Sequence, residues 1–223
     1  MLPFRDHNRT QTVPVVTIAI IGLNVVVWLY EVLLQGSGQL NAFVAHWAVV
    51  PAQLVSNPAG EWFTVFSAMF MHGSWMHIIG NMLYLWIFGD NIEDVLGSGL
   101  YLVFYLVCGL AATAAQVIVG PGSMIPNLGA SGAIAGVLGS YLLLYPQARI
   151  DTLFTLGYFL RVIQLPAIMV LGFWFVLQFF QGLGSLGVTT QQGGVAYFAH
   201  IGGFVAGLGL MALYRGLGGI QRR

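Results

Sequence analysis

Long apolar runs alternate with shorter polar or glycine-rich stretches along the whole chain. Because a helix needs about twenty mainly apolar residues to cross the core of a bilayer, each long run predicts a membrane-spanning helix. The expected spans are 15–34, 74–92, 99–119, 130–146, 163–183 and 196–214. The pattern therefore predicts an all-α membrane protein, a bundle of six transmembrane helices.

The polar stretches define the organisation of the chain. Residues 1–14 are expected to be a short N-terminal segment, 15–215 the helical domain and 216–223 a short tail. A long first loop, 36–73, separates the first two spans. The polar N-terminal segment lacks the early apolar core of a signal peptide, so we expect the first span to be retained.

The composition supports a membrane protein and limits which partners are expected. The chain is 58% hydrophobic and only 6% charged, with a mean hydropathy of +0.84. Soluble domains carry about 25% charged residues, so the lipid bilayer is the expected surrounding. The net charge is zero and no basic cluster occurs, which argues against nucleic acid as a partner.

The arginines orient the predicted bundle. They are Arg5, Arg9, Arg149, Arg161, Arg215, Arg222 and Arg223. With the N-terminus in the cytoplasm, every one of them falls on the cytoplasmic side and the three outer loops carry none. Cytoplasmic loops of membrane proteins generally carry such an excess. We therefore expect both termini to be cytoplasmic.

Four polar side chains are expected at one depth in the membrane. In this orientation the second, fourth and sixth spans all run inward, and their early residues include His77, Asn81, Ser131 and His200. Polar groups inside a membrane are costly and usually face a bundle interior or a wet cavity. The fourth span is also short, which predicts that Ser131 lies at the floor of an indentation in the outer surface.

Three reaction types are available for cutting a peptide inside a membrane: metal, aspartyl and serine chemistry. The first two are disfavoured. The His-Glu-x-x-His motif of zinc proteases is absent, and His72 and His77, five residues apart, would point about 140° apart on a helix. An aspartyl protease needs two facing carboxylates. The acidic residues are all expected in loops or at helix ends, and they are Asp6, Glu31, Glu61, Asp90, Glu93, Asp94 and Asp151. We expect no metal site and no cofactor.

A serine nucleophile with a histidine base remains. Ser131 and His200 would form a dyad, because no acidic residue is expected near His200 in depth. His77 and Asn81 are four residues apart and so share a helix face. Together with the backbone N–H of Ser131, they would donate hydrogen bonds to the oxyanion that acyl transfer generates.

Small residues on the fourth and sixth spans predict that these two helices pack closely. Gly132 and Gly136 give the fourth span a smooth face, and Gly203 and Gly207 continue a small ridge that begins at Ala199. Such spacing permits close approach of two helix backbones in a membrane. The approach would bring Ser131 within hydrogen-bond reach of His200.

The chain resembles the bacterial rhomboid intramembrane serine proteases over nearly its whole length. The resemblance rests on GASG at 129–132, HGSWMHIIGN at 72–81, AHIGGFVAG at 199–207 and GDNIEDVLG at 89–97. It implies a six-helix rhomboid-like bundle with a long first outer loop in the bacterial inner membrane. The substrates implied are single-span membrane proteins, cut near the outer face.

The resemblance also implies roles for individual residues. Ser131 would be the nucleophile and His200 the base, with the oxyanion site at His77, Asn81 and Gly129. Glu93, in a Gly-x-x-x-Glu-x-x-x-Gly pattern, and His72 would be structural. The positions near the site with a structural part are His72, Gly132, Gly203, Gly207 and Glu93.

The sequence departs from the family at two places. Phe63–Thr64 stand where a Trp-Arg pair is common, and Ala135 stands where some members carry a tyrosine that stacks on the catalytic histidine. Tyr197 or close packing would then have to hold His200. The resemblance also implies that the fifth span takes part in the route for substrate, where Gln178 and Gln181 could assist, although packing is the simpler expectation for both.

Two other classes remain open at this point. One is a catalytically silent rhomboid-like protein that binds membrane clients, and the presence of Ser131 and His200 disfavours it. The other is a small-molecule transporter, which the lack of an intramembrane charge and of an inverted repeat disfavours. The sequence leaves the oligomeric state open.

Overall fold

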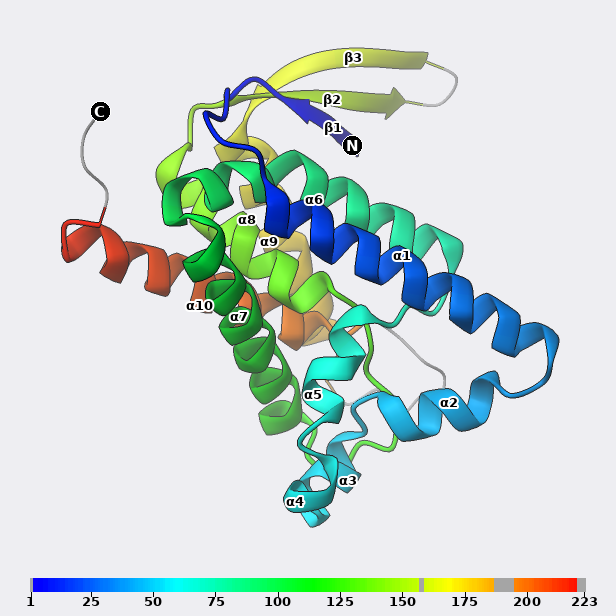
Figure 1. Cartoon of the computed structure of the whole chain (residues 1–223). Coiled ribbons are helices and arrows are strands. Elements are labelled where there is room, and N and C mark those ends of the chain that lie inside the picture. Colours follow the sequence, from blue (N-terminus) through cyan, green and yellow to red (C-terminus); the bar gives the residue numbers. More distant parts are fainter. Residues whose placement is uncertain (1, 157–158, 187–194, 220–223) are drawn as a thin grey trace.

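The computed structural model describes residues 2–156, 159–186 and 195–219 and is mostly helical (Figure 1). The six helices expected from the apolar runs are present, and a small sheet lies at one end of the bundle. The helices are α1 (Val15–Gly36), α6 (Trp75–Leu96), α7 (Ser98–Val119), α8 (Ser131–Leu144), α9 (Ala167–Ser185) and α10 (Tyr197–Gly216).

Four of these helices are long and apolar enough to cross a membrane by themselves: α1, α7, α9 and α10. Helix α6 has a similar length of 22 residues, but its last turns carry Asp90, Glu93 and Asp94. Helix α8 is the short one. Its 14 residues rise about 21 Å, less than the roughly 30 Å of a bilayer core.

Helix α8 forms the centre of the bundle. In Figure 1 it lies among α6, α7, α9 and α10, and every residue from Gly132 to Tyr141 is buried. A helix that is apolar and buried all round is a core helix, surrounded by protein instead of lipid. The start of α8 is thus fixed by its neighbours on several sides.

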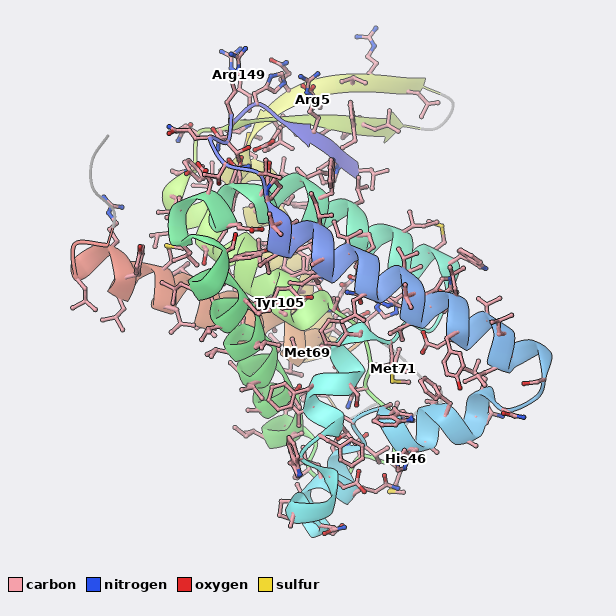
Figure 2. The ribbon with its side chains drawn as sticks, viewed as in Figure 1. Arg5, His46, Met69, Met71, Tyr105 and Arg149 are labelled. Carbon is pink, nitrogen blue, oxygen red and sulfur yellow. The ribbon has the colours of Figure 1, made fainter. Side chains whose placement is uncertain are left out.

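The long first loop is structured. It contains the short helices α2 (Leu40–Trp47), α3 (Pro51–Ser56), α4 (Pro58–Glu61) and α5 (Thr64–Ser67), followed by the 3-10 turn η1 (Ala68–Phe70). A backbone bridge between Val49 and Asn127 ties this loop to the segment before α8. Figure 2 shows His46 of α2 at the end of the molecule opposite Arg5 and Arg149.

A three-stranded antiparallel sheet was not expected from the sequence. Strand β2 (Arg149–Leu156) pairs with β3 (Phe159–Pro166) on one side and with β1 (Leu2–Asp6) on the other. The predicted fifth span, 163–183, is therefore wrong at its start, because residues 163–166 belong to β3 and α9 begins at Ala167. Of the predicted tail, 220–223 lie outside the described residues.

The N-terminal strand is fastened to the bundle through Asp6. Its carboxylate accepts hydrogen bonds from the hydroxyl of Tyr141 (2.8 Å) and from the amide of Asn91 (2.9 Å). Partial burial raises the pKa of Asp6 above its usual value, and the two hydrogen bonds oppose that rise. The segment before α1 thus contacts both α6 and α8.

Glu93 fixes the start of α1 against the end of α6. Its carboxylate accepts the backbone N–H groups of Val16 (2.9 Å) and Thr17 (2.8 Å), and the hydroxyls of Thr17 and Ser98. The first N–H groups of a helix have no partner within the helix, so an external acceptor is needed when they are buried. Glu93 is 1% exposed and supplies that acceptor.

Replacing Glu93 should therefore destabilise the protein measurably. Hydrogen bonds to a buried charge contribute about 1.5–3 kcal/mol each, and the Glu93→Ala change leaves several donors unpaired. The loss of even one of these bonds, at about 2–4 °C per kcal/mol, should lower the melting temperature by roughly 3–12 °C, and the full set by more. Thermal unfolding in detergent tests this expectation.

The neighbouring carboxylate provides the control. Asp94 also accepts hydrogen bonds from Thr12, but these are exposed, so Asp94→Ala should shift the melting temperature much less. Equal shifts for the two variants would show that burial of the Glu93 network does not matter.

Candidate active site

Ser131 occupies the first turn of α8. It is the first helical residue, after Ala130, and the backbone there turns through Gly129, whose φ is +129°. An L residue with a side chain rarely adopts this backbone angle, so glycine is required. The N–H of Ser131 makes no hydrogen bond within the described part of the chain.

His200 lies in the first turn of α10 and faces Ser131. Its Nε2 atom lies 2.7 Å from the Ser131 hydroxyl oxygen. The imidazole is 9% exposed, so it lies mostly within the bundle. The structure thus brings together the two residues that the sequence paired, although they are 69 positions apart.

Glycines permit the approach of α8 and α10. A Cβ atom at Gly203 would overlap the carbonyl oxygen of Gly132, and one at Gly207 would overlap the carbonyl oxygen of Gly136. The hydroxyl of Ser140 adds a hydrogen bond to the carbonyl of Gly207, at 2.9 Å. The two backbones are therefore in direct contact along the expected small-residue faces.

His77 and Gly129 lie together beside Ser131. A Cβ atom at Gly129 would come within 2.8 Å of the His77 ring, so a glycine at this position makes room for the imidazole. The N–H of Gly129 donates to the carbonyl of Ala68, at 2.8 Å. This N–H is therefore already engaged in a hydrogen bond. Gly129 shapes the expected oxyanion site without donating a hydrogen bond to it.

Asn81 is held by His72. The Asn81 amide nitrogen donates to Nε2 of His72 at 2.9 Å, and both side chains are buried. An amide carries two N–H groups, so the second remains for another acceptor. Burial lowers the pKa of His72 to about 3, which keeps this histidine neutral and able to accept.

Glu31 supports His72 in turn. The backbone N–H of His72 donates to one carboxylate oxygen of Glu31 at 3.1 Å. The expectation that all acidic residues lie in loops or at helix ends is wrong for Glu31, which is 1% exposed within α1. No second carboxylate joins this contact in the described part of the chain, so it offers no aspartyl dyad.

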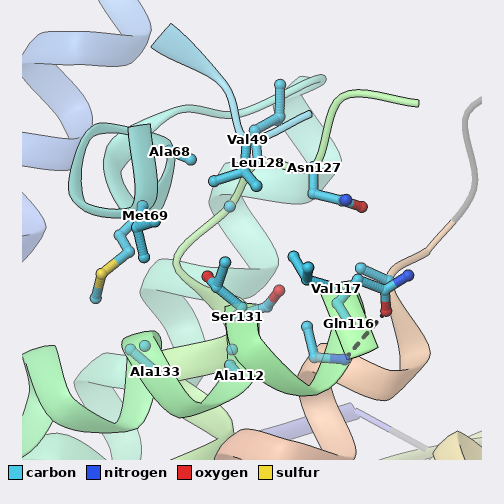
Figure 3. Close-up of a pocket in the computed structure, with 17 residues that line it drawn as sticks. Val49, Ala68, Met69, Ala112, Gln116, Val117, Asn127, Leu128, Ser131 and Ala133 are labelled. Carbon is cyan, nitrogen blue, oxygen red and sulfur yellow. Dashed lines mark hydrogen bonds between the residues drawn. The ribbon is translucent and has the colours of Figure 1, made fainter. Parts of the chain in front are cut away.

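Two hollows meet at Ser131. The larger has a volume of about 760 Å³, and its lining includes His77, Asn81, Ser131 and His200. The smaller has a volume of about 50 Å³, and its lining also includes Ser131. Figure 3 shows Ser131 there between Met69, which belongs to the first loop, and Gln116 of α7. All four polar residues expected at one depth thus border a single cavity.

Two further groups contact His200, and both come from α9. Nδ1 of His200 lies 2.6 Å from the side-chain oxygen of Gln178. The ring of Trp174 is 5.7 Å from the imidazole, centre to centre, at 35°. Sequence reasoning considered Gln178 only for the substrate route or for packing, and it found neither Gln178 nor Trp174 as a partner of His200. No hydrogen bond or ring contact joins Tyr197 to His200 among the described residues.

The described residues contain no group of three or more His, Cys, Asp and Glu side chains arranged to hold a metal ion. His72 precedes α6, so the helical spacing assumed from the sequence does not apply to it. Its ring lies 5.0 Å from that of His77, centre to centre. The absence of a metal and of a cofactor stays a prediction.

Comparison with known proteins assigns the family. The rhomboid domain model matches residues 59–216, more than half of the chain. The chain belongs to the rhomboid family. It is a multi-pass membrane protein of that family.

The relatives include named proteases. The chain is 30% identical to the rhomboid protease GluP of Bacillus subtilis, over 78% of this chain and 32% of GluP. It is 31% identical to the rhomboid protease GlpG of Pectobacterium atrosepticum, over 92% of this chain and 62% of GlpG. A yeast mitochondrial rhomboid protein 1 is 30% identical, over 65% of this chain and 40% of that protein. The chain therefore spans between about a third and two thirds of these proteins.

The glycine contact between α8 and α10 generates a test. Gly203→Ala should lower both the melting temperature and the peptide-cleaving activity expected of the Ser131–His200 pair. The added methyl group meets the Gly132 carbonyl and forces the helices apart. Overpacking costs about 1–3 kcal/mol, and a displacement of about 1 Å at a catalytic group can cost roughly a hundredfold in rate.

Gly209 on the same helix is the matched control, because no atom lies within 4 Å of a Cβ built there. Gly209→Ala should leave activity unchanged and raise helix stability by up to about 1 kcal/mol. Wild-type melting and cleavage by Gly203→Ala would show that α8 and α10 do not depend on this contact.

Proposed function

We propose that this rhomboid protein is an intramembrane serine endopeptidase that uses Ser131 and His200 as a dyad. The observation that carries the proposal is the 2.7 Å hydrogen bond between the Ser131 hydroxyl and Nε2 of His200. A serine hydroxyl is a weak nucleophile until an adjacent base accepts its proton. The pair borders a cavity large enough for a peptide segment.

In the acylation step, the Ser131 oxygen attacks the peptide carbonyl carbon while His200 takes the hydroxyl proton. The resulting oxyanion accepts hydrogen bonds from the backbone N–H of Ser131 and the side chains of His77 and Asn81. The carbon–nitrogen bond then breaks, and His200 gives the proton to the leaving amine. This step leaves an acyl ester on Ser131.

Deacylation repeats the chemistry with water as the nucleophile. His200 takes a proton from the water, which adds to the ester carbonyl, and the same donors stabilise the second oxyanion. The ester bond breaks, Ser131 recovers its proton from His200, and the carboxylic acid product leaves. No group beyond the chain and water takes part in this sequence.

The substrates we propose are single-span membrane proteins. Ser131 starts a short helix at the centre of the bundle and borders a cavity that polar side chains help to line, so a peptide bond can reach it only by leaving the lipid. A helical peptide bond is shielded by its own hydrogen bonds. Segments with Gly or Pro, which unwind most readily, should therefore be cut best.

The proposed location is a bacterial cell membrane with both termini in the cytoplasm. Arg5 and Arg149 lie at the sheet end of the molecule (Figure 2), and positive charge generally marks the cytoplasmic side. The cavity with Ser131 then opens toward the outer side. Cleavage would occur near the outer face.

The competing proposal is a catalytically silent rhomboid protein that binds clients. Such a protein needs no hydrogen bond between a serine and a histidine, so the Ser131–His200 contact favours the protease. A cleavage assay distinguishes the two proposed functions directly.

Ser131→Ala and His200→Ala should each reduce cleavage of a single-span model substrate to near background, with the melting temperature retained. The double variant should be little worse than either, because groups that act as a unit are not additive. The measurement is the cleavage rate in detergent or liposomes. Substantial cleavage by Ser131→Ala would contradict the proposed mechanism.

A further inference from the structure

The second ring nitrogen of His200 has its own partner. Nδ1 lies 2.6 Å from the side-chain oxygen of Gln178, which is on α9. Both side chains are only 9% exposed, so water does not compete freely for either atom. Within the described residues, this is the one side chain that forms a hydrogen bond with Nδ1.

That contact selects the tautomer of His200. An amide oxygen can only accept a hydrogen bond, so the shared proton belongs to Nδ1. A neutral imidazole carries one N–H, and Nε2 is then left with its lone pair toward Ser131. This is the tautomer that a general base requires.

Helix α9 also limits the rotation of the imidazole. The Trp174 ring lies four residues, or about one helical turn, before Gln178 and packs 5.7 Å from the His200 ring centre. On α8, by contrast, the residue one turn after Ser131 is the fully buried Ala135, which has no ring to offer. The groups that hold the base are thus on α9, although the nucleophile is on α8.

We propose that Gln178 is a positioning residue for the catalytic base: it holds His200 in the tautomer and orientation that accept the proton of Ser131, with Trp174 as its packing partner. The inference rests on the proposed protease function and deepens it. It makes the dyad depend on a third helix, so that α9 has to be packed against α10 for catalysis.

A merely structural role for Gln178 is the alternative. Polar side chains often hydrogen-bond across transmembrane helices as packing contacts. A packing contact would affect stability, and activity only through stability. A positioning contact would affect kcat while the melting temperature and KM stay near their wild-type values.

The test compares three substitutions at Gln178 with one at Gln181. Gln178→Met keeps length and removes the strong acceptor, Gln178→Asn keeps the amide but shortens it by one methylene, and Gln178→Glu keeps an acceptor oxygen at full length. Gln181→Met makes the first change at an exposed site on the same helix. Cleavage kinetics and thermal unfolding are measured for each, with Ser131→Ala alongside.

The expected result is a fall in kcat of about 10- to 100-fold for Gln178→Met and Gln178→Asn, less than the full 10²–10⁴ that general-base catalysis typically contributes. KM and the melting temperature should stay near wild type. Gln178→Glu should recover most of kcat, and Gln181→Met should behave as wild type.

Wild-type kcat in Gln178→Met would overturn the inference. So would losses of activity that follow the melting temperature across all three substitutions and that Glu does not rescue. If Ser131→Ala still cleaves, the proposed function itself fails. If Ser131→Ala is inactive while Gln178→Met is fully active, only the positioning role fails.

Discussion

The close contact between α8 and α10 is the constraint on which the site depends. A hydroxyl and an imidazole on separate helices meet at 2.7 Å only if the two backbones nearly touch. Gly203 and Gly207 allow this, because any side chain there would overlap a carbonyl oxygen of α8. In a membrane no hydrophobic effect draws helices together, so tight packing of small residues is what holds them.

The burial of α8 follows from the same contact and explains the cavity. A helix of 14 residues is too short to cross a bilayer core, so its beginning lies below the surface that its longer neighbours define. Irregular backbone and polar groups are tolerated there because protein surrounds them. The hydrogen bonds from Glu31 through His72 to Asn81 show how other residues of the bundle hold one such polar group in place.

The sequence predicted the helices well and the contacts between them unevenly. Apolar runs located the six helices, and small-residue spacing located the α8–α10 contact, because both patterns are local. The sheet escaped prediction because Ile163 and Leu165 extend the apolar run of the following helix, and because β1 and β2 pair across most of the chain. Gln178 and Trp174 could not be assigned because α9 is apolar around most of its surface, so its pattern does not say which face meets α10.

His72 shows a second reason why contacts could not be predicted from the sequence. The sequence spacing of His72 and His77 suggested opposite directions, but the helix begins only at Trp75, and the two rings lie 5.0 Å apart. The helical phase of a residue can be used only once the start of the helix is known. The pairing of Ser131 with His200 did not depend on this phase, because it was predicted from their common depth and from the small residues of the two spans.

The most direct test of the account is the site and rate of covalent labelling by a fluorophosphonate, a reagent that reacts with activated serines. Mass spectrometry of the labelled, folded protein in detergent should find the adduct on Ser131, and His200→Ala should abolish it. Labelling of Ser131 at the wild-type rate in His200→Ala would contradict the claim that the contact between α8 and α10 activates this serine, and so would an adduct confined to another serine.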